Sequence, residues 1–279
     1  MSALADLIRR HRLVSFFVLA YAIAWGPWPF YAAGILPEAM FIAMGPLVAA
    51  VIVAWVAEGK DGLRDLGSRM IRWRVPVRWY AVAILTPLLV IGVTYLVNVG
   101  LGAPTVSWSS LAWSSMLMAF ALRWVNPMDG ALGEEPGWRA FAIPRLQKTR
   151  TPLVSATILG VLVAIWHLPL IVNAQGNISY IGLPTTFAVT FFYYWLFNKT
   201  GGSGLMTLLS HNVQGVITIG SFGYAGADLA RLEYLGFVAW AAIAVAVVVF
   251  DRKAWRTAPP EAVYPPAATV ASRVATPIR

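Results

Sequence analysis

The chain has no cysteine among its 279 residues. Disulfides, thiolate metal sites and a cysteine nucleophile are therefore excluded. Charged residues are also scarce, at 12% of the chain, about half of the ~25% that soluble domains carry. Histidine occurs only at positions 11, 167 and 211, and no His-Glu-x-x-His zinc motif is present. These absences exclude several common kinds of enzyme and argue against a soluble domain.

What the chain does contain is apolar, since 59% of its residues are hydrophobic. Crossing a hydrocarbon core of about 30 Å takes about 20 residues in a helix. Apolar runs of about this length fall at 13–33, 39–57, 78–100, 108–125, 151–172, 179–198, 204–222 and 229–250. The sequence therefore predicts an all-α polytopic membrane protein with about eight transmembrane helices.

The fourth apolar run does not end cleanly. Residues 126–130 interrupt it with asparagine, proline and glycine, and a helix-like pattern resumes over 131–146. A helix broken at membrane depth is tolerated only where protein or a water-filled cavity covers the freed backbone. We therefore expect a broken fourth helix, and the break points to a functional site.

The positive charges lie between the apolar runs. The net charge is +9, yet the loops at 34–38, 101–107, 173–178 and 223–228 contain no lysine or arginine. This alternation follows the positive-inside rule, so the basic residues indicate orientation in a cell membrane and not nucleic-acid binding. Both termini are predicted to be cytoplasmic. We expect one transmembrane domain over residues 1–256, with an interfacial helix at 60–77, and a disordered cytoplasmic tail at 257–279.

Two adjacent glutamates and an arginine stand within this apolar chain. One charged side chain at the centre of a bilayer costs roughly 2.5–3.5 kcal/mol on insertion scales, so Glu134, Glu135 and Arg139 require an explanation. Glu135 and Arg139 are four residues apart and can pair on one helix face. Glu134 then has no partner in its own helix. Neighbouring carboxylates in unlike environments are a common way to build a general base.

Two of the three histidines fall inside apolar runs. His167 lies in the fifth and His211 in the seventh, whereas His11 lies in the basic N-terminal flank. From the rise of about 1.5 Å per residue, we expect both to reach the depth of Glu134 and to share one cavity with it. The alternative is structural: each histidine bonds a neighbouring helix, and the glutamates form an ion-pair network with Arg139 and Arg123. The combination of these groups at one depth favours a functional site.

A serine protease is a weaker alternative. The sequence Gly-Gly-Ser-Gly at 201–204 matches the Gly-x-Ser-Gly of rhomboid proteases and would make Ser203 a nucleophile. His211, however, follows eight residues later, about 12 Å along the same helix, so the two side chains cannot hydrogen-bond. An aspartyl dyad is not supported, because Asp228 is isolated in a loop.

The sequence EEPGWRAFAIPRLQ at 134–147 resembles the first motif of the CPBP family, which comprises the CAAX prenyl proteases and bacteriocin-processing enzymes and is also called the Abi family. The sequence WHLPL at 166–170 is similar to the second motif, and His211 in a late apolar helix to the third. The resemblance implies an intramembrane endopeptidase, similar to type II CAAX prenyl endopeptidases, with an all-helical fold.

The resemblance also implies roles for individual residues. Glu134 and His167 would activate a water molecule that attacks the scissile carbonyl, His211 would help to hold the oxyanion, and Glu135 and Arg139 would support the site. The family often has phenylalanine four residues before the second-motif histidine, where this chain has valine at 163. It usually has asparagine or aspartate four residues after the third-motif histidine, where this chain has glycine at 215. Gln214, three residues after His211 and near the same helix face, can supply the missing group, as can Asn212, although it points elsewhere. The alternative is a weakened or substrate-specific oxyanion site.

A metal ion remains an open alternative. Glu134, His167 and His211 are an acceptable set of three ligands for a divalent metal such as zinc, with an open fourth position, and the same groups can also act without metal.

The expected substrate is a membrane-associated protein or peptide, with or without an attached lipid. Two rival functions remain: a non-catalytic relative that acts as an immunity factor or binds a partner, and a proton-coupled transporter. Oligomeric state is left open.

Overall fold

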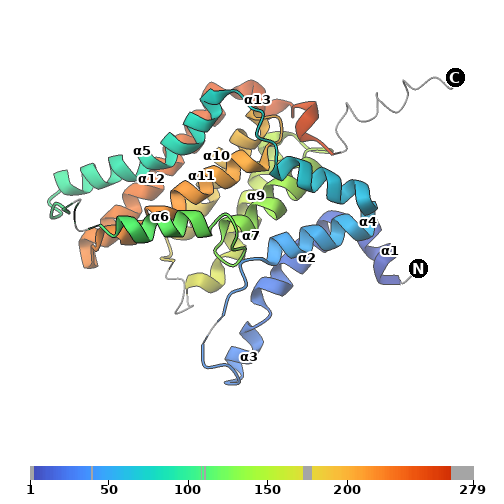
Figure 1. The fold of residues 1–279 in the computed structure, drawn as a ribbon, viewed down its shortest axis with the longest axis horizontal. Helices are drawn as coiled ribbons and strands as arrows, with labels where there is room; N and C mark the ends of the chain where they lie inside the picture. Colours follow the sequence, from blue (N-terminus) through green and yellow to red (C-terminus); the bar gives the residue numbers. More distant parts are fainter. Residues whose placement is uncertain (1–2, 39, 108, 110, 172–177, 265–279) are drawn as a thin grey trace.

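The computed structural model describes residues 3–38, 40–107, 109, 111–171 and 178–264, and all regular structure in these residues is helical. The α-helices (Figure 1) are α1 (Ala3–Arg10), α2 (Arg12–Trp25), α3 (Trp28–Ala32), α4 (Gly45–Met70), α5 (Val77–Gly100), α6 (Trp113–Leu122), α7 (Ala131–Glu135), α8 (Ile143–Leu146), α9 (Pro152–Trp166), α10 (Gly182–Lys199), α11 (Gly204–Val216), α12 (Gly226–Phe250) and α13 (Arg252–Arg256). Seven residues between α7 and α8 form a π-helix, η2 (Pro136–Ala142). Short 3₁₀-helices are η3 (Leu168–Ile171), η4 (Ile219–Phe222) and η5 (Pro260–Ala262). The predicted all-α fold class is confirmed.

Three described segments are long and apolar enough to cross a membrane: Arg12–Ala32, Val77–Gly100 and Gly226–Phe250. They support a membrane protein, whereas the predicted number of eight spans is not confirmed. One reason is that several apolar runs continue past the helix they contain. The run at 151–172 holds α9, which ends at Trp166, and the run at 204–222 holds α11, which has 13 residues.

The packed helices enclose the central segment, residues 133–147, which carries the two glutamates. α2 lies against α4, α5 lies against α11 and α12, and α10 lies against α9 and α12. Figure 1 shows α5 and α12 on one side of the molecule, α2 and α4 on the other, and α9, α10 and α11 between them. α7 and η2 pack on α4, and α7 also packs on α11. Residues 133–147 are all buried, so the segment with the two glutamates lies inside the protein.

Aromatic side chains fix this central segment in place. Trp138 of η2 and Trp166 at the end of α9 are completely buried, and their rings meet edge to face with centroids 5.5 Å apart. Phe16 of α2 also meets the Trp138 ring edge to face, with centroids at the same distance. Two indole N–H groups add directional bonds: Trp166 donates to the carbonyl of Ala20 at 3.4 Å, and Trp25 donates to the carbonyl of Trp166 at 3.0 Å. Helix α2 therefore holds the end of α9, immediately before His167.

The expected interfacial helix at 60–77 is a continuation of α4. Gly59, with φ 61° and ψ −143°, kinks the helix at this point, and the second part ends at Met70. Leu66 and Arg69 on this part are buried. The arginines of the region led to the prediction of a separate helix on lipid, whereas Arg69 is completely enclosed by protein.

The last described residues, 257–264, are ordered, although the sequence places them in a disordered tail. The Arg69 guanidinium pairs with Asp65 at 3.0 Å and donates to the carbonyls of Glu261 at 2.9 Å and Val263 at 3.2 Å. The side-chain amide of Gln147 donates to the carbonyl of Ala262. A buried guanidinium needs several acceptors, and backbone carbonyls of this segment provide two of them. Residues 265–279 of the predicted tail lie outside the described residues.

Candidate active site

The predicted break after the fourth apolar run is present. Helix α6 ends at Leu122, and α7 begins at Ala131. Within the break, Arg123 Nη1 donates to Asp129 Oδ1 at 2.8 Å, and Asn126 Oδ1 accepts from the backbone N–H of Met128 at 3.1 Å. Asp129 balances the charge of Arg123, and Asn126 provides an acceptor for a backbone N–H group that the break leaves without a helical partner. The chain then enters the protein interior as α7.

The π-helix η2 continues α7 through the first motif. π-helical turns are rare and occur frequently at functional sites. Here the wide turn packs directly on the start of α4 through Gly137. A Cβ atom added to Gly137 would stand 2.5 Å from both the Cβ and the carbonyl oxygen of Pro46. Only glycine permits this approach, because the obstacle is the backbone and ring of another helix.

Replacement of Gly137 by alanine is therefore expected to separate η2 from α4. Overpacking of this kind costs typically about 1–3 kcal/mol, so the Gly137→Ala variant should melt at a lower temperature in detergent than the wild type. The matched control is Gly92→Ala in α5, where no atom lies within 4 Å of the new Cβ and alanine favours the helix. Equal melting temperatures for the two variants would contradict the close packing described here.

Glu134 and His167 face each other. Glu134 Oε2 of α7 lies 3.9 Å from His167 Nε2 at the end of α9, and the two side chains are 8% and 12% exposed. The other ring nitrogen of His167, Nδ1, lies 2.8 Å from the carbonyl oxygen of Val163. A carbonyl can only accept, so Nδ1 carries the proton and, in a neutral ring, Nε2 presents its lone pair toward Glu134. Two proton acceptors thus lie side by side in a nearly closed space.

Glu135 and His211 form a second pair beside the first. His211 Nδ1 of α11 lies 2.9 Å from Glu135 Oε1, and Arg139 Nε lies 3.4 Å from Glu135 Oε2. The predicted pairing of Glu135 with Arg139 is confirmed. The Arg139 guanidinium also stacks on the Tyr193 ring, 5.0 Å from its centroid, and this ring lies 5.6 Å from the imidazole of His211. Glu135 is completely buried, so its charge is balanced inside the protein.

The two pairs share a chain segment, because Glu134 and Glu135 are consecutive. The structure thus gives two glutamate–histidine pairs on one short segment, Glu134 with His167 at the end of α9 and Glu135 with His211 on α11. Of the two groups expected to replace the missing third-motif side chain, Gln214 is held by Tyr193, whose hydroxyl donates to its Oε1. Asn212 is completely buried, and neither atom of its amide has a partner among the described residues.

Sequence reasoning missed Tyr193 at this site. The residue lies on α10, in a run of aromatic residues that gives no signal of function. Its position is evident only from tertiary packing, where it supports Arg139, His211 and Gln214 at once. No spacing rule connects α10 to the three motifs.

A shared metal site does not follow from this arrangement. In the part of the chain that the structure describes, no group of three or more histidine, aspartate or glutamate side chains is placed to hold an ion. Zinc donors each lie about 2.0–2.2 Å from the metal, which requires ligand atoms closer together than the 3.9 Å between Glu134 and His167. Glu135 occupies His211 Nδ1, so only Nε2 of this ring is free for an ion. These residues do not fit a metal as they stand.

Ser203 has a structural role. Its hydroxyl donates to the carbonyl of Arg72 at 2.7 Å and accepts from the backbone N–H of Met206 at 3.3 Å, so it caps the N-terminus of α11. Asp228, expected to be isolated in a loop, instead lies in the first turn of α12 and pairs with Arg231 at 2.6 Å. Neither residue contacts the glutamate–histidine pairs, and the structure gives no support to the serine or aspartyl alternative.

Comparison with known proteins gives one family match. No curated protein matches the chain significantly. Residues 113–217, however, match the family model described as type II CAAX prenyl endopeptidase Rce1-like. The matched stretch begins at α6 and ends directly after α11, so it contains the broken helix, the π-helix and both glutamate–histidine pairs. Through this stretch the chain matches the Rce1-like type II CAAX prenyl endopeptidases, as its motifs predicted, and the match supports a CAAX-protease-like intramembrane endopeptidase in general.

Proposed function

We propose that the protein hydrolyses a peptide bond of a membrane-associated protein or peptide, with Glu134 and His167 activating the attacking water. The observation that carries this proposal is the buried pair itself, with Glu134 Oε2 3.9 Å from His167 Nε2. A water beside both atoms can donate one hydrogen to each acceptor, which directs its oxygen lone pair outward toward a substrate carbonyl. General-base catalysis requires this placement of acceptors within hydrogen-bonding reach of the water.

The bond changes follow from these positions. Glu134 takes a proton as the water oxygen bonds to the carbonyl carbon, and the carbonyl oxygen becomes an oxyanion. Collapse of this tetrahedral intermediate breaks the C–N bond, and the proton on Glu134 passes to the leaving amine. Glu135 holds the ring of His211 by Nδ1, which fixes the direction of Nε2 at the site.

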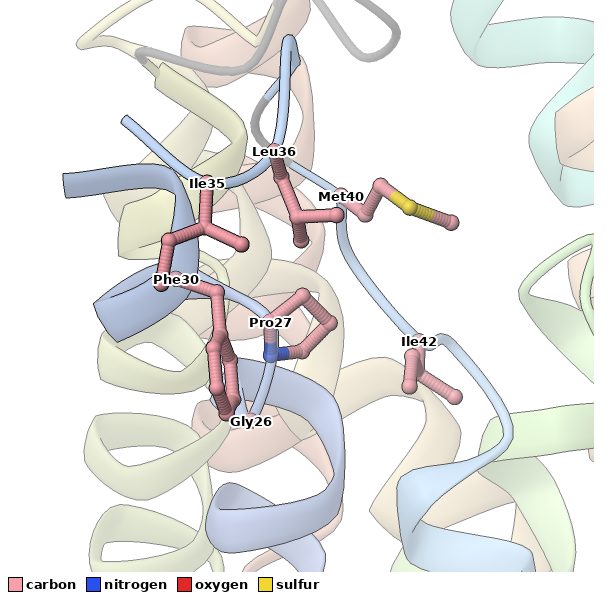
Figure 2. Close-up of a pocket in the computed structure, with 7 residues that line it drawn as sticks. All are labelled: Gly26, Pro27, Phe30, Ile35, Leu36, Met40 and Ile42. Carbon is pink, nitrogen blue, oxygen red and sulfur yellow. The ribbon is translucent and has the colours of Figure 1, made fainter. Parts of the chain in front are cut away.

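An apolar cavity near the site suits a substrate with an apolar part. The cavity, of about 370 Å³, is lined by Phe30 of α3, by residues between α2 and α3, and by the segment that leads to α4. Figure 2 shows Phe30 and Ile35 next to each other on the α3 side, and Met40 and Ile42 on the segment returning to α4. The next residue, Ala43, packs closely on Gly133, since a Cβ at Gly133 would stand 2.7 Å from the Ala43 carbonyl oxygen. We propose that this cavity receives apolar side chains or an attached lipid of the substrate.

The two ends of the described chain meet, which supports both termini on one side of the membrane. Residues Arg9, Arg10 and Arg12 line a cavity of about 430 Å³ together with Lys148 and Tyr264. By the positive-inside rule, we propose that this end of the bundle is cytoplasmic and that the protein resides in the cell membrane.

The test is cleavage of a membrane-anchored reporter peptide by the purified protein in lipid vesicles, with products identified by mass spectrometry. We expect the wild type to release a peptide pair that differs from the substrate by one water. His167→Ala should lower the rate by about 10²-fold or more, because it removes one of the two acceptors of the water. His11→Ala is the matched control, since His11 is exposed and its side chain makes no capping bond to α2. Absence of wild-type cleavage would refute the proposal, and pH-driven ion flux would favour the transporter.

A further inference from the structure

Neither glutamate–histidine pair supplies a fixed donor for the oxyanion. The carboxylate of Glu135 can only accept, so His211 donates from Nδ1, and a neutral ring then has no proton on Nε2. Four residues after His211, on the same helix face, the chain has Gly215 and thus no side chain. Stabilising the oxyanion with preorganised donors is a large part of catalysis in peptide hydrolysis. A group outside the two pairs must supply this donor.

The guanidinium of Arg123 fills the space above Gly215. A Cβ atom added to Gly215 would stand 2.4 Å from Arg123 Cζ and 2.4 Å from Arg123 Nη2. No side chain can occupy position 215 while Arg123 keeps this conformation. The missing side chain at position 215 of α11 therefore makes the room that the guanidinium of Arg123, the residue after α6, occupies.

The same guanidinium extends to the side of Glu134. The point where a Gly130 Cβ would stand lies 3.9 Å from Arg123 Nη2 and 3.4 Å from Glu134 Oε1. Arg123 is anchored by one bond, from Nη1 to Asp129 at 2.8 Å. Its Nε is buried and has no hydrogen-bond partner among the described residues, and its side chain is only 11% exposed. The charge of Arg123 thus lies between the proposed base and the helix of His211, with donor capacity that Asp129 does not use.

We propose that Arg123 binds the oxyanion formed during peptide hydrolysis, from the space above Gly215 that a side chain at this position would otherwise occupy. This inference rests on the proposed function. An arginine stays charged at every relevant pH and offers N–H donors in a rigid plane, so it can donate without the protonation that His211 would require. The competing explanation is that Arg123 serves only to close the break between α6 and α7 through Asp129.

The two explanations differ in a double substitution. Loss of one oxyanion donor costs about 10²–10³-fold in kcat. We therefore expect Arg123→Ala to lower kcat by about this factor and to change KM by less than about twofold, since the donor acts in the transition state. Gly215→Asn alone should also lose activity, because its Cβ collides with the guanidinium. The double variant Arg123→Ala/Gly215→Asn should be at least about tenfold more active than either single variant, because the asparagine amide then takes the vacated place.

Controls separate this inference from the proposed function. Arg231→Gln breaks an arginine–aspartate pair of similar length away from the site, and it should keep wild-type kcat. Wild-type cleavage together with full activity of Arg123→Ala would overturn the inference and leave the proposed function intact. A loss in Arg123→Ala that Gly215→Asn does not relieve, with a lowered melting temperature, would also overturn it and assign Arg123 to the fold. Greater loss in Gln214→Ala than in Arg123→Ala would assign the donor to Gln214, and no wild-type cleavage would overturn both proposals.

Discussion

Glu134→Gln is expected to reduce peptide cleavage by about 10²–10⁴-fold, the range that a general base contributes. Glutamine has nearly the same shape but cannot take a proton from water. The side chain has no salt bridge other than its 3.9 Å approach to His167 within the described structure, so its replacement removes little packing. We therefore expect an unchanged melting temperature in detergent. The measurement is kcat for the reporter peptide, in parallel with thermal unfolding of the same preparation.

Two further variants make the Glu134 result specific. Glu233→Gln in α12 removes an acid outside the glutamate–histidine pairs and should leave cleavage at the wild-type rate. Glu134→Asp keeps a carboxylate but withdraws it from His167, so cleavage should fall to an intermediate level, whereas a proton-coupled transporter should tolerate this change. Cleavage by Glu134→Gln at more than a tenth of the wild-type rate would rule out Glu134 as the base.

Glu135→Ala, in contrast to Glu134→Gln, should chiefly lower the stability of the protein. Glu135 is completely buried, and Arg139, 2% exposed, has its charge balanced by this carboxylate at 3.4 Å. Removal of one member of a buried ion pair costs about 3–5 kcal/mol, because the remaining charge is left without compensation. The variant also takes the acceptor from His211 Nδ1. We expect a clearly lowered melting temperature, poor recovery from membranes, and loss of cleavage in the fraction that folds.

Neutralising both members of the pair isolates the electrostatic cause. Glu135→Gln/Arg139→Gln buries no charge, so it should recover much of the melting temperature that Glu135→Ala loses. It should not recover cleavage, since His211 then lacks the carboxylate that orients its ring. A Glu135→Ala protein as stable as the wild type would show that the Arg139 charge is compensated elsewhere and would contradict the arrangement described here.

Local spacing and chemical type were sufficient to predict part of the site. The i,i+4 relation of Glu135 and Arg139 predicted their pairing, and the 3.4 Å contact confirms it. The break at 126–130 also followed from residue type, since proline and glycine end helices regardless of tertiary context. The resemblance of the motifs identified the family that matches residues 113–217. The catalytic roles of Glu134, His167 and His211 remain predictions, and the 3.9 Å approach of Glu134 to His167 supports the first two.

Features that depend on contacts between distant segments could not be predicted. The periodicity used for helices assumes 3.6 residues per turn, so it gave no indication of the π-helix at Pro136–Ala142. Arg123 occupies the space above Gly215 only because the end of α6 approaches α11, and no local pattern records that approach. Hydropathy predicted the span at 204–222 but not the end of α11 at Val216, because an apolar run does not show where a helix stops.

The ordered residues near the C-terminus fasten the start of the helix that carries His211. Arg69 donates to the carbonyls of Glu261 and Val263, and the same guanidinium lies 2.5 Å from where a Gly202 Cβ would stand, directly before the Ser203 cap of α11. The backbone carbonyls of Glu261 and Val263 thus stabilise the start of a helix that is distant in sequence. Truncation of the chain before Glu261 would remove two hydrogen-bond acceptors from the completely buried Arg69 guanidinium. An affinity tag is therefore better added after these residues than in place of them.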